Sequence, residues 1–281
     1  MRALVVEQGW SRGALAAVRG LARGGWTVGL AAPAGPGLAA ASRAVSRRHV
    51  VAGLQPSVDA FVASVAAAVR SGGYDVVFGA GEAELLALSA RRDELPAVFP
   101  HAAHEVVLRA VDKEHLSAAA RLVGIAVPEV VDVRSVPDER TPVVVKARLH
   151  ARPDVAGAPP RIDTTVVTGR TAARSRVAEI EAVGGEPQVQ VFHDGTLVAW
   201  TAVRGPQGVV AEVMQRASRI WPPDAGASCR ATTVAVEPQL AGRCADLLAE
   251  LGWFGLAELQ LLVGSDGVAR LIDLNGRFYG S

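Results

Sequence analysis

The sequence predicts an α/β fold with a doubly wound parallel sheet in its first third, followed by an α+β region. Two observations support this division. Short apolar runs alternate with helical patterns up to Arg92, as in a parallel sheet covered by helices. The chain then ends in two apolar runs that flank the turn residues 264–267, which is the pattern of a β-hairpin. At 281 residues, the chain can form one large or two ordinary domains.

The first third contains strand and helix patterns in regular alternation. Ser11 and Ser57 are suited to cap the first two helices, and glycine pairs follow the end of each helix. No GxGxxG pattern follows the first strand, so a dinucleotide-binding fingerprint is not expected. The expected strands are 3–6, 27–31, 49–51 and 74–78, and the expected helices are 11–23, 57–70 and 82–92.

The rest of the chain has longer strand patterns and fewer helices. A β-branched run at 141–147 ends in Lys146, which either serves a site or is a surface cation that ends a strand. The pattern 188–192 alternates as a strand, and Asp194-Gly195 forms a turn into the next strand. We expect helices at 111–122, 171–181 and 237–251, and strands at 163–168, 197–203, 209–214 and in the closing hairpin.

The closing hairpin carries polar residues on one face. Asp273 and Asn275 are two residues apart and therefore point to the same side of their strand. If the turn pairs Val263 with Val268, Glu258 and Gln260 share that face. Side-chain oxygens are the ligands that Mg²⁺ prefers. A solvated outer face is the alternative, but Arg277 two residues later favours a metal-bound phosphate, because a guanidinium binds phosphate oxygens well.

The composition draws attention to three residues. The chain has 29 Lys and Arg residues, but only Lys113 and Lys146 are lysines, and Asn275 is its single asparagine. Such an arginine-rich composition indicates a GC-rich coding sequence. In such a sequence, a lysine whose only role is to carry a positive charge tends to be replaced by arginine. A lysine that remains is therefore a candidate for a role that needs a compact point charge, with chance survival of any one of the three residues as the alternative.

Charge and cysteine content exclude several classes of function. The net charge is +1, which argues against a nucleic-acid partner. Cys229 and Cys244 form no CxxC pair and are expected to be reduced thiols in a cytoplasmic protein. Glu7 comes too early for a signal peptide, and prolines and glycines interrupt the uncharged stretch 24–42, so we expect no membrane span.

The order of these motifs resembles the ATP-grasp superfamily over almost the whole chain. It is most similar to the carboxylate–amine ligases and to the carbamoyl-phosphate-synthase-like branch, which has Gln at its first metal position. The resemblance implies a pre-ATP-grasp domain at 1–106 and an ATP-grasp domain at 107–281, divided into subdomains 107–187 and 188–281. The matching motifs are Asp112-Lys113, residues 124–128, 142–146 and 190–192, Gly255, Gln260 and Asp273-x-Asn275-x-Arg277.

The resemblance also implies how a nucleotide would bind. Lys113 and Lys146 would contact the phosphates and the adenine side, and the backbone of the hinge strand at Gln190, Val191 and Phe192 would read adenine. The family usually has Glu at the position of Val191, which leaves the adenine and ribose contacts open.

The metal and phosphate ligands follow from the same resemblance. Oxygen ligands would hold Mg²⁺, with Mn²⁺ as an alternative, and arginines would face the γ-phosphate and an acyl phosphate. The chain ends at Ser281, directly after the motif, whereas family members continue, so we expect a truncated C-terminal subdomain. The implied metal ligands are Gln260, Asp273 and Asn275, and the implied catalytic arginines are Arg277, Arg216 and Arg219.

The implied activity is an ATP- and Mg²⁺-dependent ligase that joins a small-molecule carboxylate to an amine through an acyl phosphate. A carbamoyl- or carboxyl-phosphate-forming enzyme of the same fold is the alternative. The departure at Val191 and the early end of the chain favour a third interpretation, a nucleotide-binding protein without turnover. We expect ATP and small molecules as partners, with no nucleic acid and no membrane, in a cytoplasmic protein for which a homodimer is an option.

Overall fold

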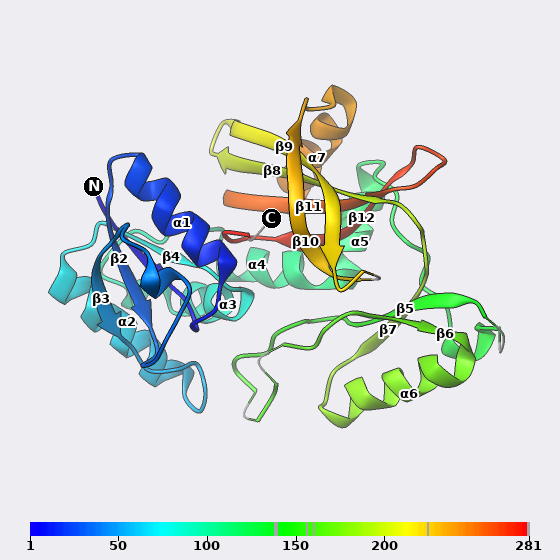
Figure 1. Cartoon of the computed structure of the whole chain (residues 1–281), viewed down its shortest axis with the longest axis horizontal. Helices are drawn as coiled ribbons and strands as arrows, with labels where there is room; N and C mark the ends of the chain where they lie inside the picture. Colours follow the sequence, from blue (N-terminus) through cyan, green and yellow to red (C-terminus); the bar gives the residue numbers. More distant parts are fainter. Residues whose placement is uncertain (138–139, 156, 160, 224, 280–281) are drawn as a thin grey trace.

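The computed structural model describes residues 1–137, 140–155, 157–159, 161–223 and 225–279 (Figure 1). Within these residues the strands form a four-stranded, a three-stranded and a five-stranded sheet. Figure 1 shows the four-stranded sheet on one side of the molecule, with the other two sheets facing each other on the opposite side. The predicted combination of α/β and α+β regions is confirmed.

The four-stranded sheet is parallel and has the order β3-β2-β1-β4. Helices α1 and α2 cover its two faces, as a doubly wound sheet requires (Figure 1). Strand β1 is fully buried from Ala3 to Val6, because both faces of a parallel sheet are covered. The strands are β1 (Arg2–Val6), β2 (Thr27–Ala32), β3 (Val45–Val50) and β4 (Val76–Gly79), and the helices are α1 (Arg12–Arg23), α2 (Val58–Gly72) and α3 (Glu82–Ala90).

The two predicted N-caps are confirmed. The Ser11 side chain accepts a hydrogen bond from the backbone of Ala14, and the Ser57 side chain accepts one from Ala60. Gly73 ends α2 with a φ of 60°, which is the left-handed conformation that glycine adopts at little cost. The start and stop signals in the sequence therefore mark the ends of these two helices.

The helix expected at 111–122 is present, and a further helix that was not predicted precedes it. The expected helix is α5 (Lys113–Leu122), and the additional helix α4 (His104–Val111) meets it at Asp112. The Asp112 side chain accepts hydrogen bonds from the backbone of Glu114 and His115, so it caps α5 and ends the preceding helix. The helix α4 was missed because Ala103, its N-cap residue, gives no capping signal in the sequence.

The three-stranded sheet is antiparallel, has the order β6-β5-β7, and is covered by α6. Its third strand begins at Pro187, so the expected subdomain boundary at 187/188 falls at the start of a strand that pairs with β5. Its elements are β5 (Pro142–Ala147), β6 (Thr165–Thr168), α6 (Gly169–Ala182) and β7 (Pro187–Val191). Short 3₁₀ helices lie at Ala39–Ala41, Arg92–Glu94 and Val133–Ser135.

The five-stranded sheet is antiparallel, with the order β10-β9-β8-β11-β12. Strand β9 is longer than the predicted 209–214, and β10 was not predicted. Most residues of β10 are exposed, so it lacks the alternation of apolar residues by which a strand is recognised. Its elements are β8 (Thr196–Gly205), β9 (Gly208–Trp221), β10 (Ala227–Val234), α7 (Pro238–Glu250), β11 (Gly255–Val263) and β12 (Ala269–Asn275).

The register of the closing hairpin differs from the prediction, but its polar face is as expected. Val263 pairs with Ala269 rather than with Val268, and a β-bulge follows between Gln260 and Leu261. Each change shifts the pairing by one residue, and one shift alone would turn the side chains of β12 to the other face. The two shifts together preserve the face, so Glu258 and Gln260 lie opposite Asn275 and Asp273 (pairs 258–275 and 260–273).

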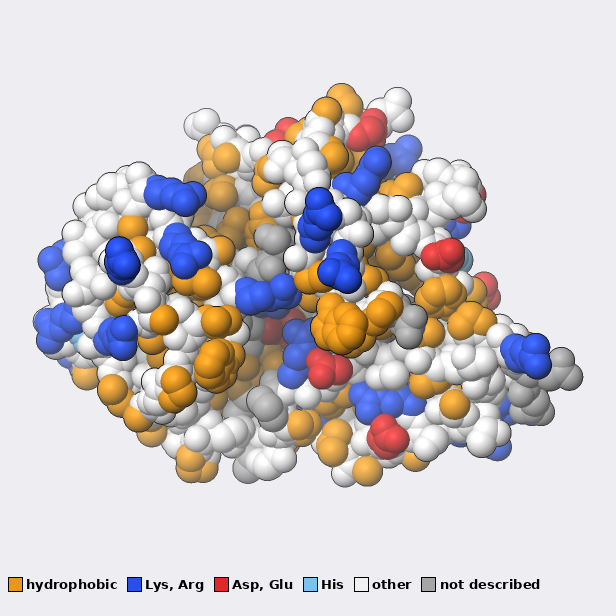
Figure 2. Space-filling view, in the orientation of Figure 1, with side chains coloured by type: hydrophobic (Ala, Val, Ile, Leu, Met, Phe, Trp, Pro, Cys, Tyr) orange, Lys and Arg blue, Asp and Glu red, His pale blue; other side chains and the backbone are white. Residues whose placement is uncertain are grey.

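The space-filling view shows a hollow between the N-terminal α/β region and the rest of the molecule, with Lys and Arg side chains gathered around it (Figure 2). Among the described residues, no helix is long and apolar enough to cross a bilayer.

Candidate active site

The polar face of β11 and β12 forms a connected network of side chains. Asn275 donates a hydrogen bond from Nδ2 to Glu258 Oε2 at 2.8 Å, and Gln260 Nε2 donates to the same oxygen at 3.1 Å. Arg277 Nη2 donates to Asn275 Oδ1 at 2.9 Å. Glu258 is fully buried and Asn275 nearly so, which shows that this face is an interior surface rather than a solvated one.

Both lysines reach this strand from distant parts of the chain. Lys113 Nζ forms an ion pair with the carboxylate of Asp273. Lys146 Nζ donates to the backbone oxygen of Ile272 at 3.4 Å. The side chains of Lys113 and Lys146 are almost fully buried, although lysine is rarely buried without a specific partner. The structure therefore brings two ammonium groups together at β12.

The start of α5 and the end of β5 are held together by Asp112 and Arg148. The guanidinium of Arg148 binds both carboxylate oxygens of Asp112, at 2.7–3.0 Å. Burial acts to raise the pKa of Asp112, but hydrogen bonds from Arg148 and His115 outweigh it and hold that pKa at about 2. Because Lys113 follows Asp112 and Lys146 lies two residues before Arg148, this pairing sets the two lysines side by side.

The buried charges shift one another's ionisation. Burial, together with the charge of Lys113, lowers the pKa of Lys146 to about 8, against the opposing effect of Asp273. Burial acts to raise the pKa of Asp273, but the nearby Lys113 holds it well below its usual range. Burial raises the pKa of Glu258 to about 7, despite hydrogen bonds from Asn275 and Gln260 that act to lower it. Strong shifts in a cluster of this kind are typical of functional sites.

Two further residues lie in this electrostatic environment and were not predicted as site residues. His150 is buried, and its Nε2 has no hydrogen-bond partner among the described residues. Burial and the charge of Lys113 lower its pKa to about 3, so the ring is neutral at ordinary pH. Burial also raises the pKa of Glu82, which Lys113 opposes. Only the folding of distant segments brings these residues together, so no sequence pattern identifies them.

The predicted hinge residues connect the two antiparallel sheets. Gln190 is buried in β7 and pairs with Val144, and the backbone N–H of Val191 donates to the carbonyl of Glu129 at 2.9 Å. Phe192 follows directly, in the short link between β7 and β8. This segment is the connection between the three-stranded and the five-stranded sheet, as expected for a hinge.

The structure separates the three predicted arginines. Arg277 joins the polar network, as described above. Arg216 pairs with Val198, which pairs in turn with Leu261, so Arg216 lies on the sheet face opposite to Gln260. Arg219 lies farther along β9 and lines a different pocket with Arg12. The strand predicted here ended at residue 214 and did not include Arg216 or Arg219, so the sequence pattern did not assign either residue to a face.

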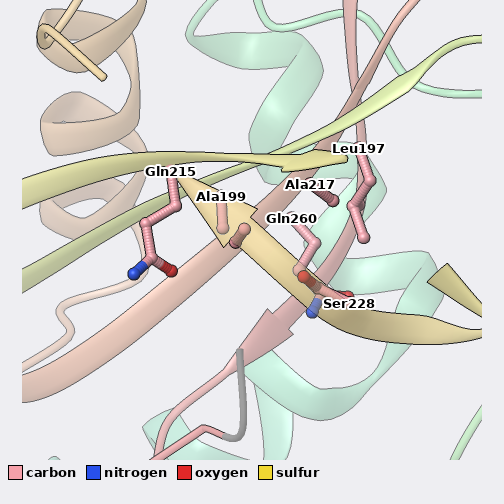
Figure 3. Close-up of a pocket in the computed structure, with 7 residues that line it drawn as sticks. Leu197, Ala199, Gln215, Ala217, Ser228 and Gln260 are labelled. Carbon is pink, nitrogen blue, oxygen red and sulfur yellow. The ribbon is translucent and has the colours of Figure 1, made fainter. Parts of the chain in front are cut away.

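Strand β10 closes over the Gln260 side of the polar face. A cavity of about 10 Å³ remains there, which is close to the space needed for one water molecule (Figure 3). Gln215 Oε1 and Ser228 Oγ are buried at this place and have no partner among the described residues. The cavity is lined by Leu197, Ala199, Gln215, Ala217, Ser228, Ala231 and Gln260.

The donor set of the polar face fits a hard cation. Among the residues that the structure describes, no three or more His, Cys, Asp or Glu side chains are grouped so that they could hold a metal ion. The polar face has two carboxyl groups, those of Glu258 and Asp273, beside the amides of Gln260 and Asn275. Mg²⁺ is usually held by one or two carboxylates together with water and substrate phosphates, so this oxygen set suits it when a nucleotide is bound.

Comparison by sequence finds no matching family model and no matching curated protein. Comparison of structures finds clear similarity. An L-amino acid ligase from Bacillus licheniformis superimposes with a TM-score of 0.69 at 14% identity, covering 98% of this chain and 66% of the ligase. The biotin carboxylase domain of a 2-oxoglutarate carboxylase from Hydrogenobacter thermophilus, in complex with MgADP and bicarbonate, gives 0.67 at 12% identity, covering 98% and 64%.

A third similar structure is N5-carboxyaminoimidazole synthetase from Staphylococcus aureus in complex with ADP, with a TM-score of 0.67 at 10% identity, covering 98% of this chain and 70% of the synthetase. The chain thus spans about two thirds of the length of these three proteins. All three are ATP-grasp enzymes. The similarity extends over nearly the whole chain, and this protein therefore has the ATP-grasp fold, as the order of its motifs predicted.

Proposed function

We propose that this protein is an ATP- and Mg²⁺-dependent ligase that joins a carboxylate to an amine through an acyl phosphate. The observation that carries the proposal is the convergence of Lys113 and Lys146 on β12, next to the carboxylate of Asp273. Two buried ammonium groups beside an oxygen-rich face suit a metal-bound polyphosphate. The similarity to an L-amino acid ligase and to ADP-bound enzymes supports this assignment.

The chain's own residues would bind and position the nucleotide. Lys113 and Lys146 would neutralise the phosphate oxygens, and the backbone of Gln190, Val191 and Phe192 would read adenine at the hinge. Gln260, Asp273 and Asn275, with Glu258 on the same face, would hold Mg²⁺. When bound, Mg²⁺ supplies charge neutralisation and orientation of the phosphates.

The reaction needs little covalent chemistry from the protein. A carboxylate oxygen of the substrate attacks the γ-phosphorus, the bond to the β-phosphate oxygen breaks, and ADP leaves. The amine nitrogen then attacks the acyl carbon, loses a proton and displaces inorganic phosphate. Arg277, which donates to Asn275, would stabilise the charge that develops on the transferred phosphoryl group. The neutral ring of His150 is buried where it could donate to a phosphate oxygen.

The activity can be tested by the release of ADP from ATP in the presence of Mg²⁺ and pairs of amino acids. We expect Lys146→Met to weaken ATP binding by about 100-fold or more, because it removes a buried charge from the phosphate site. Arg174→Gln, at an exposed position of α6, is the matched control and should bind ATP as the wild type does. Equal ATP affinity in the two variants would show that Lys146 does not contact the nucleotide.

Carboxyl-phosphate formation is the second candidate. One similar structure is a biotin carboxylase domain with bicarbonate bound. ADP release that depends on bicarbonate and not on an amino acid would favour this reaction. ATP binding without release of ADP under any of these conditions would identify a nucleotide-binding protein without turnover. The domain division, a homodimer and a cytoplasmic location stay predictions from the sequence.

A further inference from the structure

A second pocket lies at the hollow between the N-terminal α/β region and the five-stranded sheet. Its volume is about 420 Å³, within the range of roughly 300–1,000 Å³ typical of small-molecule sites. It is formed where the first turn of α1 meets the paired ends of β9 and β10. Its lining residues are Arg12, Arg219, Trp221, Ala227 and Cys229.

The pocket brings together two arginines that form no ion pair with any residue that the structure describes. Arg12 Nη1 donates to the backbone oxygen of Ser228 at 3.2 Å, which ties α1 to β10. Neither Arg12 nor Arg219 takes part in an ion pair among the described residues. The chain as a whole carries a net charge of only +1, so two unpaired guanidinium groups in one pocket are not a consequence of a generally basic surface.

The first turn of α1 contributes Arg12 to the pocket. This turn contains no acidic residue, while the Ser11 side chain caps the helix and the Ser11 N–H donates to the buried Glu7 carboxylate at 3.0 Å, so the positive charge at the pocket comes from the Arg12 side chain. Trp221 is 69% exposed, so its indole ring is available for a ligand. Guanidinium groups bind carboxylate or phosphate in a bidentate manner, and the ring can cover an adjoining planar or apolar part.

The pocket adjoins the candidate nucleotide site. Gly13, in the first turn of α1, packs so closely on Phe278 that a Cβ at this position would lie 2.4 Å from the Phe278 carbonyl oxygen. Phe278 directly follows Arg277, which donates to Asn275 on the polar face. The short segment 275–278 therefore runs from the polar face to the first turn of α1, where the pocket residue Arg12 precedes Gly13.

We propose that this pocket binds the anionic end, a carboxylate or phosphate group, of a small-molecule substrate. That the anion belongs to a substrate rests on the ligase function proposed above, whereas the binding of an anion does not. Arg219, which the family resemblance assigned to the γ-phosphate, would thus act in substrate recognition together with Arg12.

The test measures binding of malonate and of inorganic phosphate to the full chain by calorimetry, at an ionic strength held constant with sodium chloride. We expect saturable binding of at least one probe, weakened at least tenfold in Arg12→Gln and in Arg219→Gln. Arg19→Gln, at an exposed position of the same helix, should bind as the wild type does. The better of the two probes identifies the anion class.

Tryptophan fluorescence locates the binding. The probe should change the emission of the wild type, and Trp221→Phe should remove most of that change. The absence of saturable binding, equal binding in all variants, or an undiminished signal in Trp221→Phe would each overturn the proposal.

The same variants separate this proposal from the ligase function. ATP affinity should be unchanged in Arg12→Gln, because Arg12 is not part of the phosphate site. Suppose that neither the wild type nor any variant binds ATP, whereas binding of the probe depends on Arg12. The ligase proposal is then wrong, and the proposal that the pocket binds an anion is supported. If ATP binds but the probes do not, the anion pocket fails alone.

Discussion

Strand β1 of the N-terminal parallel sheet and the final hairpin are both buried, but they bury different chemistry. Strand β1 buries the apolar run from Ala3 to Val6. The hairpin buries Glu258 and Asn275 beside the Asp273–Lys113 ion pair. Burying hydrocarbon stabilises a fold, whereas burying ionisable groups costs free energy unless they are hydrogen-bonded or paired. The difference indicates that strand β1 stabilises the fold, and it makes the hairpin the candidate site.

The strongest test of this comparison removes a large side chain from the apolar region. Phe61, on α2, is fully buried in the core. We expect Phe61→Ala to lower the free energy of unfolding by about 3–5 kcal/mol, because it leaves a cavity. Urea denaturation measures this loss, and calorimetry at low temperature should show that the folded variant binds ATP with unchanged affinity. A parallel loss of ATP affinity would contradict the division between the two regions.

A second test uses a titratable residue between the two regions. His101 is buried against Phe99, with ring centroids 4.5 Å apart, and burial lowers its pKa to about 4. In the unfolded chain, His101 binds a proton near pH 6.5. In the folded chain, it stays neutral until the pH falls to about 4. Stability should fall as the pH decreases through this interval, by up to about 3 kcal/mol.

His101→Phe should remove this part of the acid sensitivity, because a phenyl ring fits the same aromatic cluster and does not titrate. The measurement is the difference in free energy of unfolding between wild type and variant at pH 7 and pH 4.5. A difference that does not change with pH would show that His101 does not titrate as its burial implies.

The third test changes the polar region. Asn275→Leu removes hydrogen bonds to Glu258 and to Arg277, and should lower the free energy of unfolding by about 1–3 kcal/mol. Its larger consequence should be functional: the gain in nucleotide affinity that Mg²⁺ provides should disappear. Calorimetry of ADP binding with and without Mg²⁺ measures this. Arg270→Gln, near the turn of the same hairpin, is the control, and an undiminished Mg²⁺ effect in Asn275→Leu would exclude Asn275 as a ligand.

Local signals in the sequence predicted much of the fold. Ser11 and Ser57 cap helices as expected, and the alternation of strands and helices predicted the parallel sheet. The rarity of lysine singled out Lys113 and Lys146, which the structure brings to the same strand. Each of these inferences depends on composition or on neighbours within one turn or strand.

The features that were missed depend on long-range contacts. The exposed strand β10 has no apolar pattern of its own and forms by pairing with β9. Arg216 was expected at the site, but the register of β9 places it on the other face. The residues around Arg12 and around His150 come from segments far away in the sequence, so no spacing rule could identify either residue as part of a site.

The bulge in the closing hairpin has a consequence for how this chain can evolve. Side chains alternate along a strand, so the face on which Asp273 and Asn275 lie depends on whether the number of residues between Gln260 and Asp273 is odd or even. Loss of one residue from the turn 264–267 would direct both side chains into the apolar layer that β12 forms with α4 and α5, whereas loss of two would not. Insertions and deletions in this hairpin are therefore tolerated in steps of two, a constraint that scanning by substitution would never reveal.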